Sequence, residues 1–489
     1  MQRLRGAVGL SGIPRLVMDD VYIDITDLVA YAQAYGEVTG IQRVQERILH
    51  EFAQTDSCDH IWCLRIADTQ DHYQACRLGD LYAPGCMNLL DRLACLGEDR
   101  PHGSWPSRMQ IRAYLNRRGS RGWRRVAGKL GVYARAAFLP SSLEAHGIVR
   151  SRLHTVETVT LDQIPPQATL VLLGAAWNDH RVSVAAARHA AAGGQLIQFL
   201  YDLIPIKHPE YFRSGLQQSF ETFFDMNLQH VSRFVCISEN TRHDLEEVLS
   251  AKGIRVPSSV LPLAHEFPGY PRNARGCRPT DERLDGFRNP GQKFMLCVGT
   301  LEIRKNGLSL LQAWQDLKLL LGEETPHLVF CGRRGWKMRP FFSLLESDPW
   351  LRSRVHIVPN ASDADIAYLH EHSLCSIYPS LYEGWGLPVG EAAWFGRTCI
   401  TSQESSLPEI CGMLADYVDP RNPSEIARAV HRAVTDQARL LLREKLIRQA
   451  TLRTWHDVAE RFYEIVSSDV KTSVAHTHQR PSLPIRQAA

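Results

Sequence analysis

The layout of this chain is easiest to recognise in residues 379–396, which read PSLYEGWGLPVGEAAWFG. An apolar run at 375–380 predicts a buried strand, and the apolar pattern that opens near Leu387–Pro388 predicts a helix. Gly384 and Gly386 lie in the loop between the two. Glycine lets the backbone approach a ligand, proline suits the first turn of a helix, and the free N–H groups of that turn attract phosphate. The stretch therefore predicts a strand–loop–helix unit that binds an anion.

A second stretch, CVGTLEIRKNGLSLLQAW at 297–314, has the same layout. A predicted strand ends at Gly299, the loop carries Arg304 and Lys305, and a helix is predicted from about Gly307. Ligands of α/β sheets bind at the loops that follow the carboxyl ends of parallel strands. Two adjacent cations in such a loop can pair with a diphosphate. A solvated basic loop is the alternative interpretation of the same residues.

Short apolar runs alternate with helical patterns along the whole chain, which is typical of βα units and parallel sheets. Strands are predicted at 21–25, 60–66, 168–174, 194–202, 233–238 and 258–263, and then at 293–299, 327–332, 354–359, 375–380 and 397–402. Amphipathic helices are predicted between them, for example at 308–321, 363–372 and 423–436. The fold class is therefore α/β, with two Rossmann-like domains.

Residues 265–292 are rich in Pro, Gly and Arg, and they lack apolar periodicity, so they hold the best candidate for an interdomain linker. The polar residues after about Ser468 predict a disordered tail. The predicted division of the chain is an N-terminal extension (1–20), an N-terminal domain (21–275) with a basic insertion at about 98–153, a linker (276–292), a C-terminal domain (293–467) and the tail (468–489).

The composition is that of a soluble globular protein, with 44% hydrophobic and 22% charged residues. A net charge of +3 gives no reason to expect nucleic acid as a partner. The twelve cysteines form no C-x-x-C pair and several lie in apolar runs, which favours buried thiols in a reducing cytoplasm over disulfides or a zinc site. We expect neither a signal peptide nor a transmembrane helix, because no apolar run approaches about 18 residues.

Residues 100–152 carry twelve Lys and Arg side chains but a single acid, Glu144. Apolar residues such as Trp123 and Phe138 share one helical face there, and basic residues occupy another. A basic amphipathic helix can lie on an anionic membrane surface, so the segment predicts peripheral contact with the inner face of the cell membrane. A solvated charged surface is the competing interpretation, and two glycines weaken the helix.

The motifs of the second half resemble the retaining glycosyltransferases of family 4, whose GT-B architecture has two Rossmann-like domains facing a central cleft. GTLEIRKN (299–306) is similar to the GTLEPRKN string of a bacterial mannosyltransferase-like branch, with Ile303 at the usual Pro. Glu383 and Glu391 match the family's E-x7-E pair. Three further strings match in order and spacing: CGRRGW (331–336), VPNASDADIAYLH (358–370) and SSLPEICGMLADYVDP (405–420).

The resemblance implies which side chains bind the donor. Lys305, with Arg304 beside it, would hold the diphosphate, Glu383 would bind the hydroxyls of the donor sugar, and Glu391 would bind the nucleotide ribose. For Glu391 alone, an acid that complements the helix dipole is an equally simple explanation. Thr300 stands where many relatives carry Arg, so the neutralisation of the diphosphate falls more heavily on Arg304 and Lys305.

Backbone groups complete the implied donor site. The N–H groups that would bind the distal phosphate belong to Gly384, Trp385, Gly386 and Leu387. The residues that would border the base are Gly332 and Val358. All of these lie at or just after the ends of predicted strands, which puts them at the edge of the sheet where ligands bind.

The acceptor side resembles the family more weakly. VTGIQRVQERIL (38–49) looks like the family's first glycine loop and helix. Gly40 would let the backbone approach the reacting centre, and Arg43 would meet a phosphate. A plain strand–helix turn explains the same residues equally well.

FLYDLIPIKHPEYF (199–212) resembles another string of the family's first domain. Asp202 in it is a candidate for catalysis or for acceptor contact. Tyr201 is a candidate on the acceptor side, but it stands where many relatives have His, which weakens a general acid–base role at that position. Farther along, Ser238 or Asn240 is expected to cap a helix.

The resemblance implies a hexosyltransferase that moves a sugar from a nucleoside diphosphate to a hydroxyl with retained configuration. The branch implies GDP-mannose, with UDP-glucose or a deoxysugar nucleotide as alternatives. The implied acceptor is a lipid-linked oligosaccharide or saccharide in polysaccharide or exopolysaccharide biosynthesis. The resemblance also implies metal-independent chemistry without a cofactor, and no D-x-D string lies at a suitable place for a metal.

Two other classes of protein are weighed against the transferase. One is a non-catalytic nucleotide-sugar-binding protein of the same fold, and the intact set of Lys305, Glu383 and Glu391 argues against it. The other is an NAD-type oxidoreductase. No predicted strand of this chain is followed by G-x-G-x-x-G, which argues against dinucleotide binding.

Overall fold

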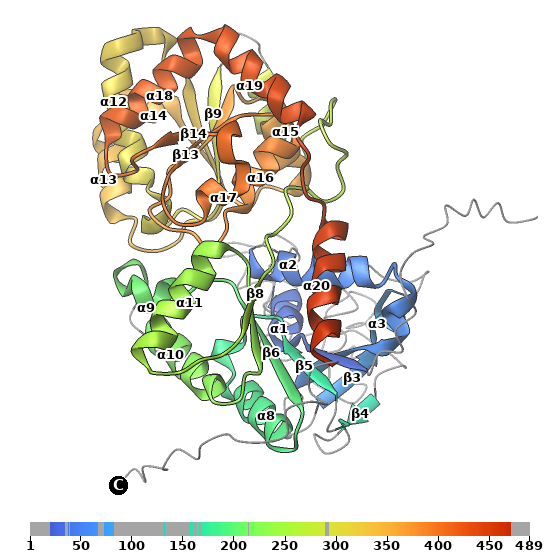
Figure 1. Ribbon diagram of the computed structural model, residues 1–489. Coiled ribbons are helices and arrows are strands. Elements are labelled where there is room, and N and C mark those ends of the chain that lie inside the picture. The colour runs from blue at the N-terminus through green and yellow to red at the C-terminus, as the bar shows by residue number, and fades with distance from the viewer. Residues whose placement is uncertain are drawn as a thin grey trace, which may run out of the picture.

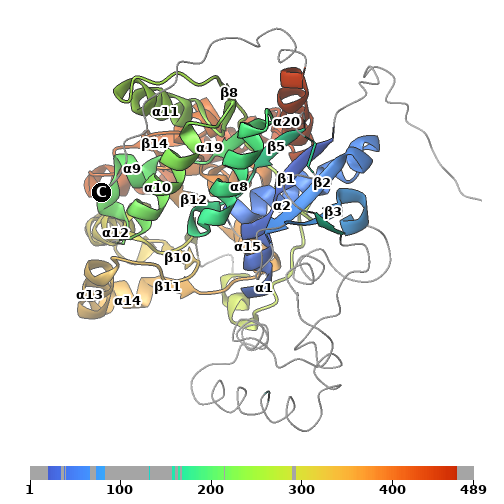
Figure 2. The same ribbon diagram turned by 90° about the horizontal axis from the view of Figure 1, so that it is seen from below.

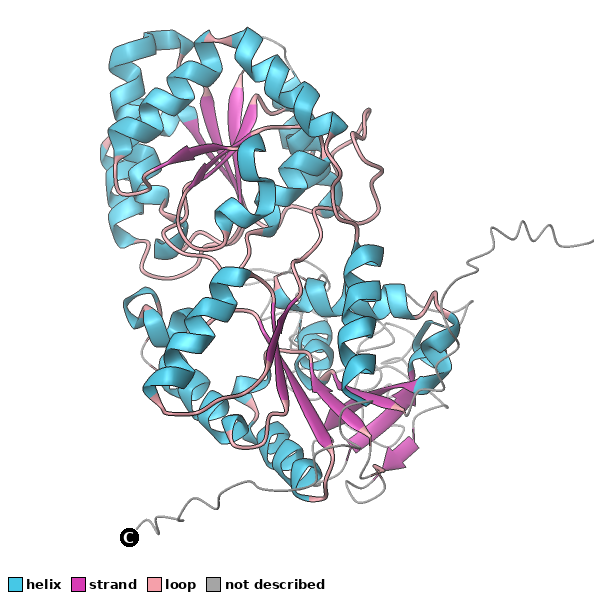
Figure 3. Ribbon diagram, in the orientation of Figure 1, coloured by secondary structure: helices cyan, strands magenta, loops and turns pink. Residues whose placement is uncertain are grey.

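The computed structural model describes residues 20–34, 38, 40–66, 73–82, 132, 157–159, 164–165, 168–213, 215–288 and 293–470 of the 489-residue chain. They form two α/β domains, and helices surround a central sheet in each (Figures 1 and 3). Apart from Val132, the basic segment at 100–152 lies outside the described residues, as do nearly all of the N-terminal extension and of the tail. The predictions for those segments stay predictions.

The N-terminal domain is built on an eight-stranded sheet of order β4-β3-β2-β1-β5-β6-β7-β8. Its strands are β1 (Val21–Asp24), β2 (Ile61–Ile66), β3 (Tyr73–Arg77), β4 (Glu157–Val159), β5 (Thr169–Leu172), β6 (Gln195–Leu200), β7 (Arg233–Cys236) and β8 (Ser258–Val260). Six of them are parallel and lie within their predicted ranges. The antiparallel strands β3 and β4 are not predicted, because neither contains a long apolar run.

Helices cover both faces of this sheet, so neighbouring residues of one strand enter two different cores. In β6, Ile197 and Phe199 pack with α1 (Thr26–Ala34) and α2 (Ile41–Phe52), whereas Leu196 and Leu200 pack on the other face. Strands covered on both faces read as continuous apolar runs, which is why they are predictable. The other helices of this domain are α3 (Leu78–Tyr82), α8 (His180–Ala191), α9 (Ile204–Lys207), α10 (Leu216–Leu228) and α11 (Glu239–Ala251).

The C-terminal domain has a six-stranded parallel sheet of order β11-β10-β9-β12-β13-β14. Its strands are β9 (Phe294–Val298), β10 (His327–Cys331), β11 (Val355–Val358), β12 (Cys375–Tyr378), β13 (Cys399–Ser402) and β14 (Asp416–Val418), and only β14 falls outside the predicted ranges. Its helices are α12 (Gly307–Leu321), α13 (Arg339–Ser347), α14 (Pro349–Arg354), α15 (Asp363–His372), α16 (Leu387–Trp394), α17 (Leu407–Cys411), α18 (Pro423–Thr435) and α19 (Gln437–Gln449).

The last described helix, α20 (Trp455–Val470), leaves the C-terminal domain and packs on the N-terminal one (Figures 1 and 2). The fully buried ring of Phe462 lies 5.7 Å from that of Phe52 and 5.6 Å from that of Phe199, between centroids. The predicted C-terminal domain at 293–467 includes this helix, and that assignment needs correction. Apolar periodicity shows that a helix has a buried face but not which domain covers it.

The described part of the predicted linker is held against the C-terminal domain. The carboxylate of Glu371 in α15 accepts hydrogen bonds from the N–H groups of Gly276 and Cys277, each at 2.8 Å. Asp365 accepts one from the N–H group of Thr280 at 2.7 Å. The chain therefore crosses between the domains here and again before α20. None of the helices described is both long enough and apolar enough to cross a bilayer.

Candidate active site

Two loops of the C-terminal domain meet at the edge of the sheet that faces the N-terminal domain. Strand β9 is followed by a 3-10 turn, Ile303–Lys305, and then by α12. Strand β12 is followed by the glycine-containing loop and then by α16, which begins at Leu387 with Pro388 in its first turn, as predicted. Because β9 and β12 are neighbours in the sheet, the two loops lie side by side.

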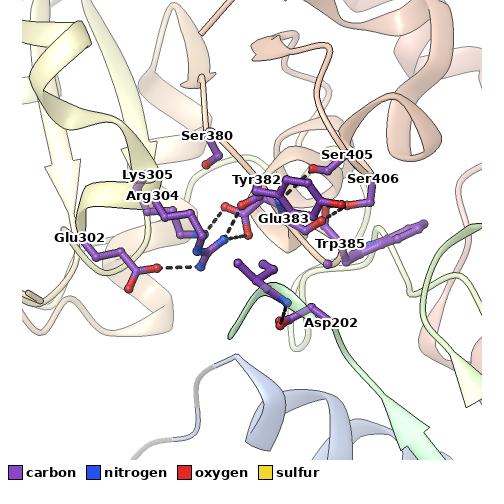
Figure 4. A network of polar contacts seen from close by, with 12 residues as sticks. Asp202, Glu302, Arg304, Lys305, Ser380, Tyr382, Glu383, Trp385, Ser405 and Ser406 are labelled. Carbon is purple, nitrogen blue, oxygen red and sulfur yellow. Dashed lines mark hydrogen bonds and ion pairs between the residues drawn. The ribbon is translucent and has the colours of Figure 1, made fainter. Parts of the chain in front are cut away.

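Glu383 lies at the centre of the contacts between these loops (Figure 4). One oxygen of its carboxylate lies 2.5 Å from Nη1 of Arg304, and the other lies 2.6 Å from Nζ of Lys305. Burial by itself disfavours the charged carboxylate, but the attraction of Arg304 and Lys305 outweighs it and lowers the pKa of Glu383 to about 2. Glu383 is therefore ionised at neutral pH.

Both cations have further protein partners. Arg304 also donates to the carboxylate of Glu302 at 2.6 Å and to the carbonyl oxygen of Tyr382 at 2.7 Å. Lys305 donates to the hydroxyl of Tyr378 as well as to Glu383. An ammonium group has three donors, so Lys305 has one more to offer. The two terminal nitrogens of Arg304 are engaged by its neighbours, whereas its Nε is buried without a hydrogen-bond partner.

Residues that the sequence did not single out hold these loops in place. Asn306 has φ +61°, a left-handed conformation that asparagine tolerates, and its Nδ2 donates to the carbonyls of Pro379 at 3.0 Å and Pro420 at 2.6 Å. The N–H group of Glu383 donates to Oγ of Ser405 at 2.8 Å. Ser406 donates to the carbonyl of Glu383 at 2.9 Å. The two serines belong to the SSLPE string (405–409), which follows a predicted strand. Its position at the ligand-binding edge of the sheet is the feature from which the sequence could have indicated them.

Four buried polar atoms in and beside this cluster have no hydrogen-bond partner among the described residues. They are Oγ of Ser380, Nε1 of Trp385, Nε of Arg304 and Oε2 of Glu302, and Figure 4 shows these side chains around Glu383. A buried polar group without a partner costs about 1–3 kcal/mol, and a bound polar molecule is one way in which such a group is satisfied. Gly386, with φ +116°, then turns the chain into α16.

Glu391 in α16 lies at the boundary between the domains and contacts Arg43 of α2. Nη1 of Arg43 lies 3.2 Å from Glu391, and Nη2 lies 2.5 Å from Asp363 at the start of α15. The sequence predicts that Arg43 meets a phosphate, but the structure pairs it with these two carboxylates. Gly40 precedes α2 with φ +56° and has open space around it.

Asp202 and Tyr201 follow β6 and bring the N-terminal domain to this site. Asp202 lies across the boundary from Glu383, and its carboxylate accepts a hydrogen bond from the N–H group of Ile204 at 3.0 Å (Figure 4). Burial raises the pKa of Asp202 to about 6, against the attraction of Arg304. The hydroxyl of Tyr201 donates to the carbonyl of Leu173 at 2.9 Å, so this side chain points into the N-terminal domain instead of toward an acceptor.

The other predicted residues lie at the ends of β9, β10 and β11. A side chain on Gly332 would place its Cβ 1.9 Å from the carbonyl oxygen of Gly299, so glycine is required there by strand packing. Its N–H group donates to the carbonyl of Val358 at 3.0 Å. Thr300 follows Gly299 on the same edge of the sheet.

Metal-ligating side chains do not gather anywhere in the part of the chain that the structure describes: no group of three or more His, Cys, Asp or Glu residues there could hold an ion. Ten cysteines fall within it, all are free thiols, and all except Cys58 are buried.

Comparisons with known proteins show what this chain is similar to. Residues 280–453 match the family model described as "Glycosyl transferases group 1". The O-antigen chain mannosyltransferase B of Escherichia coli is 26% identical over 261 residues, which cover 53% of this chain and 66% of that protein. The serotype-specific mannosyltransferase WbdA of Escherichia coli is 27% identical over 252 residues, which cover 49% of this chain and 30% of that protein. The chain thus spans just under two thirds of the first relative and under a third of the second.

Solved structures share the fold. An α,α-trehalose-phosphate synthase (UDP-forming) from Burkholderia vietnamiensis has a TM-score of 0.52 at 12% identity, over 78% of this chain and 85% of that one. "Trehalose-6-phosphate from E. coli bound with UDP-2-fluoro glucose" has a TM-score of 0.50 at 15% identity, over 71% and 79%. At these identities the likeness concerns the fold alone, and the fold is the predicted GT-B architecture.

A substitution of Gly384 can test the close contact between the two domains at the loop that follows β12. A Cβ atom there would lie 2.1 Å from the carbonyl oxygen of Tyr201 and 2.9 Å from Cβ of Asp202. We expect Gly384→Ala to push the domains apart and to increase the radius of gyration measured by small-angle X-ray scattering, because a backbone oxygen cannot move aside locally. Gly286→Ala is the control, since its Cβ would meet open space. An unchanged radius of gyration in Gly384→Ala would contradict this contact.

Proposed function

We propose that this protein is a retaining hexosyltransferase that moves mannose from GDP-mannose to a hydroxyl of a lipid-linked oligosaccharide or saccharide during polysaccharide biosynthesis. The observation that carries the proposal is the contact of Glu383 with Arg304 and Lys305 at the start of two helices, within the segment that matches the glycosyltransferase family model. Such a cluster offers a carboxylate to sugar hydroxyls and a cation to a diphosphate at one place.

In the proposed complex, the diphosphate lies between Lys305 and the start of α16. Lys305 has one donor left, and the backbone N–H groups of residues 384–387 add the positive end of a helix, so charge that develops on the leaving group is stabilised without a metal. Arg304 keeps Glu383 ionised and oriented. Glu383 then accepts hydrogen bonds from the donor sugar.

Glu391 is proposed to bind the ribose of the nucleotide. Its carboxylate is buried against Arg43, and an oxygen that faces Arg43 at 3.2 Å can exchange that contact for a ribose hydroxyl. Arg43 would keep its contact with Asp363 and so would stay beside the nucleoside. Thr300, Gly332 and the end of β11 border the space proposed for the base.

Mannose as the sugar is supported by the two Escherichia coli mannosyltransferases, whose similarity extends over about half of this chain. Guanosine as the nucleoside rests on the resemblance of the GTLEIRKN string to one bacterial branch. UDP-glucose and deoxysugar nucleotides are the alternative donors. The proposal includes neither a cofactor nor nucleic acid.

On the acceptor side, Asp202 is proposed to accept a hydrogen bond from the attacking hydroxyl. It faces Glu383 across the domain boundary, and its raised pKa makes it a better base than an exposed Asp. We also propose that the protein works in the cytoplasm at the inner face of the cell membrane, where a lipid-linked acceptor lies. The basic segment at 100–152 supplies the positive charge for that contact.

A thermal-shift screen against GDP, UDP, dTDP and their sugars tests the donor. Binding to the native state raises the apparent stability by about 2.7 kcal/mol when the ligand is at 100 times its Kd, so the correct nucleotide should give the largest shift. We expect GDP and GDP-mannose to give it, and Lys305→Ala to reduce it. A response to UDP species alone would overturn the assignment of GDP-mannose.

Variants of the charged cluster test the reaction. We expect Glu383→Gln and Lys305→Ala each to lower the incorporation of radiolabelled sugar into a membrane extract by at least about 10²-fold, the effect of removing one preorganised electrostatic contact. Lys318→Ala, on the exposed side of the same helix α12, should transfer sugar at the wild-type rate. Circular dichroism checks that the variants stay folded. Wild-type turnover in both site variants would refute the site.

The pH dependence of the transfer rate tests Asp202. A carboxyl with a pKa of about 6 is ionised above that pH, so the rate should fall tenfold per pH unit as the pH drops below about 6. Glu383 stays ionised throughout this range, since its pKa is about 2. Asp202→Asn should be slower at pH 8 and should lose this acidic limb. Parallel pH profiles for Asp202→Asn and the wild type would exclude this role.

A further inference from the structure

Tyr382, the residue before Glu383, is bound to both domains. Its carbonyl oxygen accepts a hydrogen bond from Nη1 of Arg304 at 2.7 Å, within the C-terminal domain. Its hydroxyl donates to Oδ2 of Asp244 at 2.7 Å and accepts from Nδ2 of Asn240 at 3.1 Å. Both hydroxyl partners belong to α11 of the N-terminal domain. The backbone of Tyr382 is therefore hydrogen-bonded within the C-terminal domain, and its side chain is hydrogen-bonded to the N-terminal domain.

The partner of the Tyr382 hydroxyl is itself held firmly. Asp244 is buried, and its second oxygen lies 2.6 Å from Nζ of Lys207. Lys207 also contacts Glu247, at 2.7 Å. The ring of His208 packs on that of Tyr382, with centroids 4.6 Å apart. This 2.7 Å hydrogen bond to a carboxylate that Lys207 holds in place defines where the ring of Tyr382 lies.

The residues that follow Tyr382 contact the same helix. Oγ1 of Thr241 lies 3.5 Å from the carbonyl oxygen of Gly384. The carboxylate of Glu409 in α17 accepts the N–H groups of Glu239 and Asn240 at 2.7 and 2.8 Å. The first turn of α11 thus contacts the loop that carries Glu383. It also contacts α17, the helix that follows Ser405 and Ser406, whose hydroxyls bond the backbone of Glu383.

A hydroxyl that stabilised only its own domain would find its hydrogen-bond partners there. The polar contacts of the Tyr382 side chain given above are instead made with the N-terminal domain, so they exist only while the two domains are closed on each other. Glu383 is the next residue, and its carboxylate must be held to within a fraction of an ångström to bind a reacting sugar productively. Domain closure and the position of Glu383 are therefore linked through one side chain.

We propose that Tyr382 is a positioning residue of the transfer reaction: by donating to Asp244 across the closed domain boundary, it holds Glu383 in place against the donor sugar. The inference rests on the proposed function and adds a residue to its machinery. When the domains open, the hydroxyl of Tyr382 is released, and the loop is then held from the C-terminal side alone.

The test uses the full chain and the variants Tyr382→Phe and Asp244→Asn. We expect each to lower kcat about 10- to 100-fold, while the KM for the donor and the thermal shift caused by GDP change less than twofold. The double variant should be no slower than the slower single variant, because both remove the same interaction. Hydrogen exchange at residues 382–387 should be faster in both variants.

Tyr417→Phe is the matched control. The hydroxyl of Tyr417 donates to the carbonyl of Gly412 at 2.6 Å, inside the C-terminal domain. Tyr417→Phe therefore also removes one tyrosine hydroxyl from this domain but leaves the contacts between the domains unchanged. We expect wild-type kcat and wild-type exchange at residues 382–387 from this variant.

Three outcomes would overturn the proposal. They are wild-type kcat in Tyr382→Phe, additive losses in the double variant, and unchanged exchange at residues 382–387. If the wild-type protein transfers sugar from none of the donors tested, the proposed function fails instead. In that case, hydrogen exchange at residues 382–387 still decides whether Tyr382 and Asp244 hold the loop that carries Glu383.

Discussion

The site is organised around the buried carboxylate of Glu383 between Arg304 and Lys305. An isolated buried carboxylate is strongly disfavoured, and the removal of one partner from a buried pair costs about 3–5 kcal/mol. The loops after β9 and β12 must therefore stay together for the charges to stay compensated. The same contact holds an acceptor of hydrogen bonds and a cation ready before any ligand arrives, which is the condition for electrostatic catalysis.

The two domains also contact each other around this cluster. The chain crosses the boundary at the docked linker and again before α20, so the C-terminal helix covers part of the N-terminal core. At the boundary itself, Gly384 faces the backbone of Tyr201, and Glu391 faces Arg43. Each half of the molecule contributes to the environment of the other, although the carboxylate and its two cations all come from the second half.

The charges at the boundary also change how single residues are understood. Arg43 is predicted as a phosphate ligand, yet two carboxylates, those of Asp363 and Glu391, neutralise it. Arg304 is predicted beside the diphosphate, yet Glu302, Glu383 and a carbonyl engage it. In both cases the sequence identifies the cation, but most of its partners, Tyr382 and Glu383 for Arg304 and Asp363 and Glu391 for Arg43, come from elements far away along the chain.

The amino-acid sequence alone determined the doubly covered strands, the helix starts at Gly307 and Leu387, and the meeting of Lys305 with Glu383. These follow from local periodicity and from the rule that parallel strands gather their carboxyl ends at one edge. Only the tertiary structure decided that α20 joins the other domain, that Ser405 and Asn306 hold the loops, that the hydroxyl of Tyr201 turns inward and that the hydroxyl of Tyr382 reaches Asp244. Such contacts depend on side-chain direction and on packing between distant segments, and neither leaves a periodic signal in the chain.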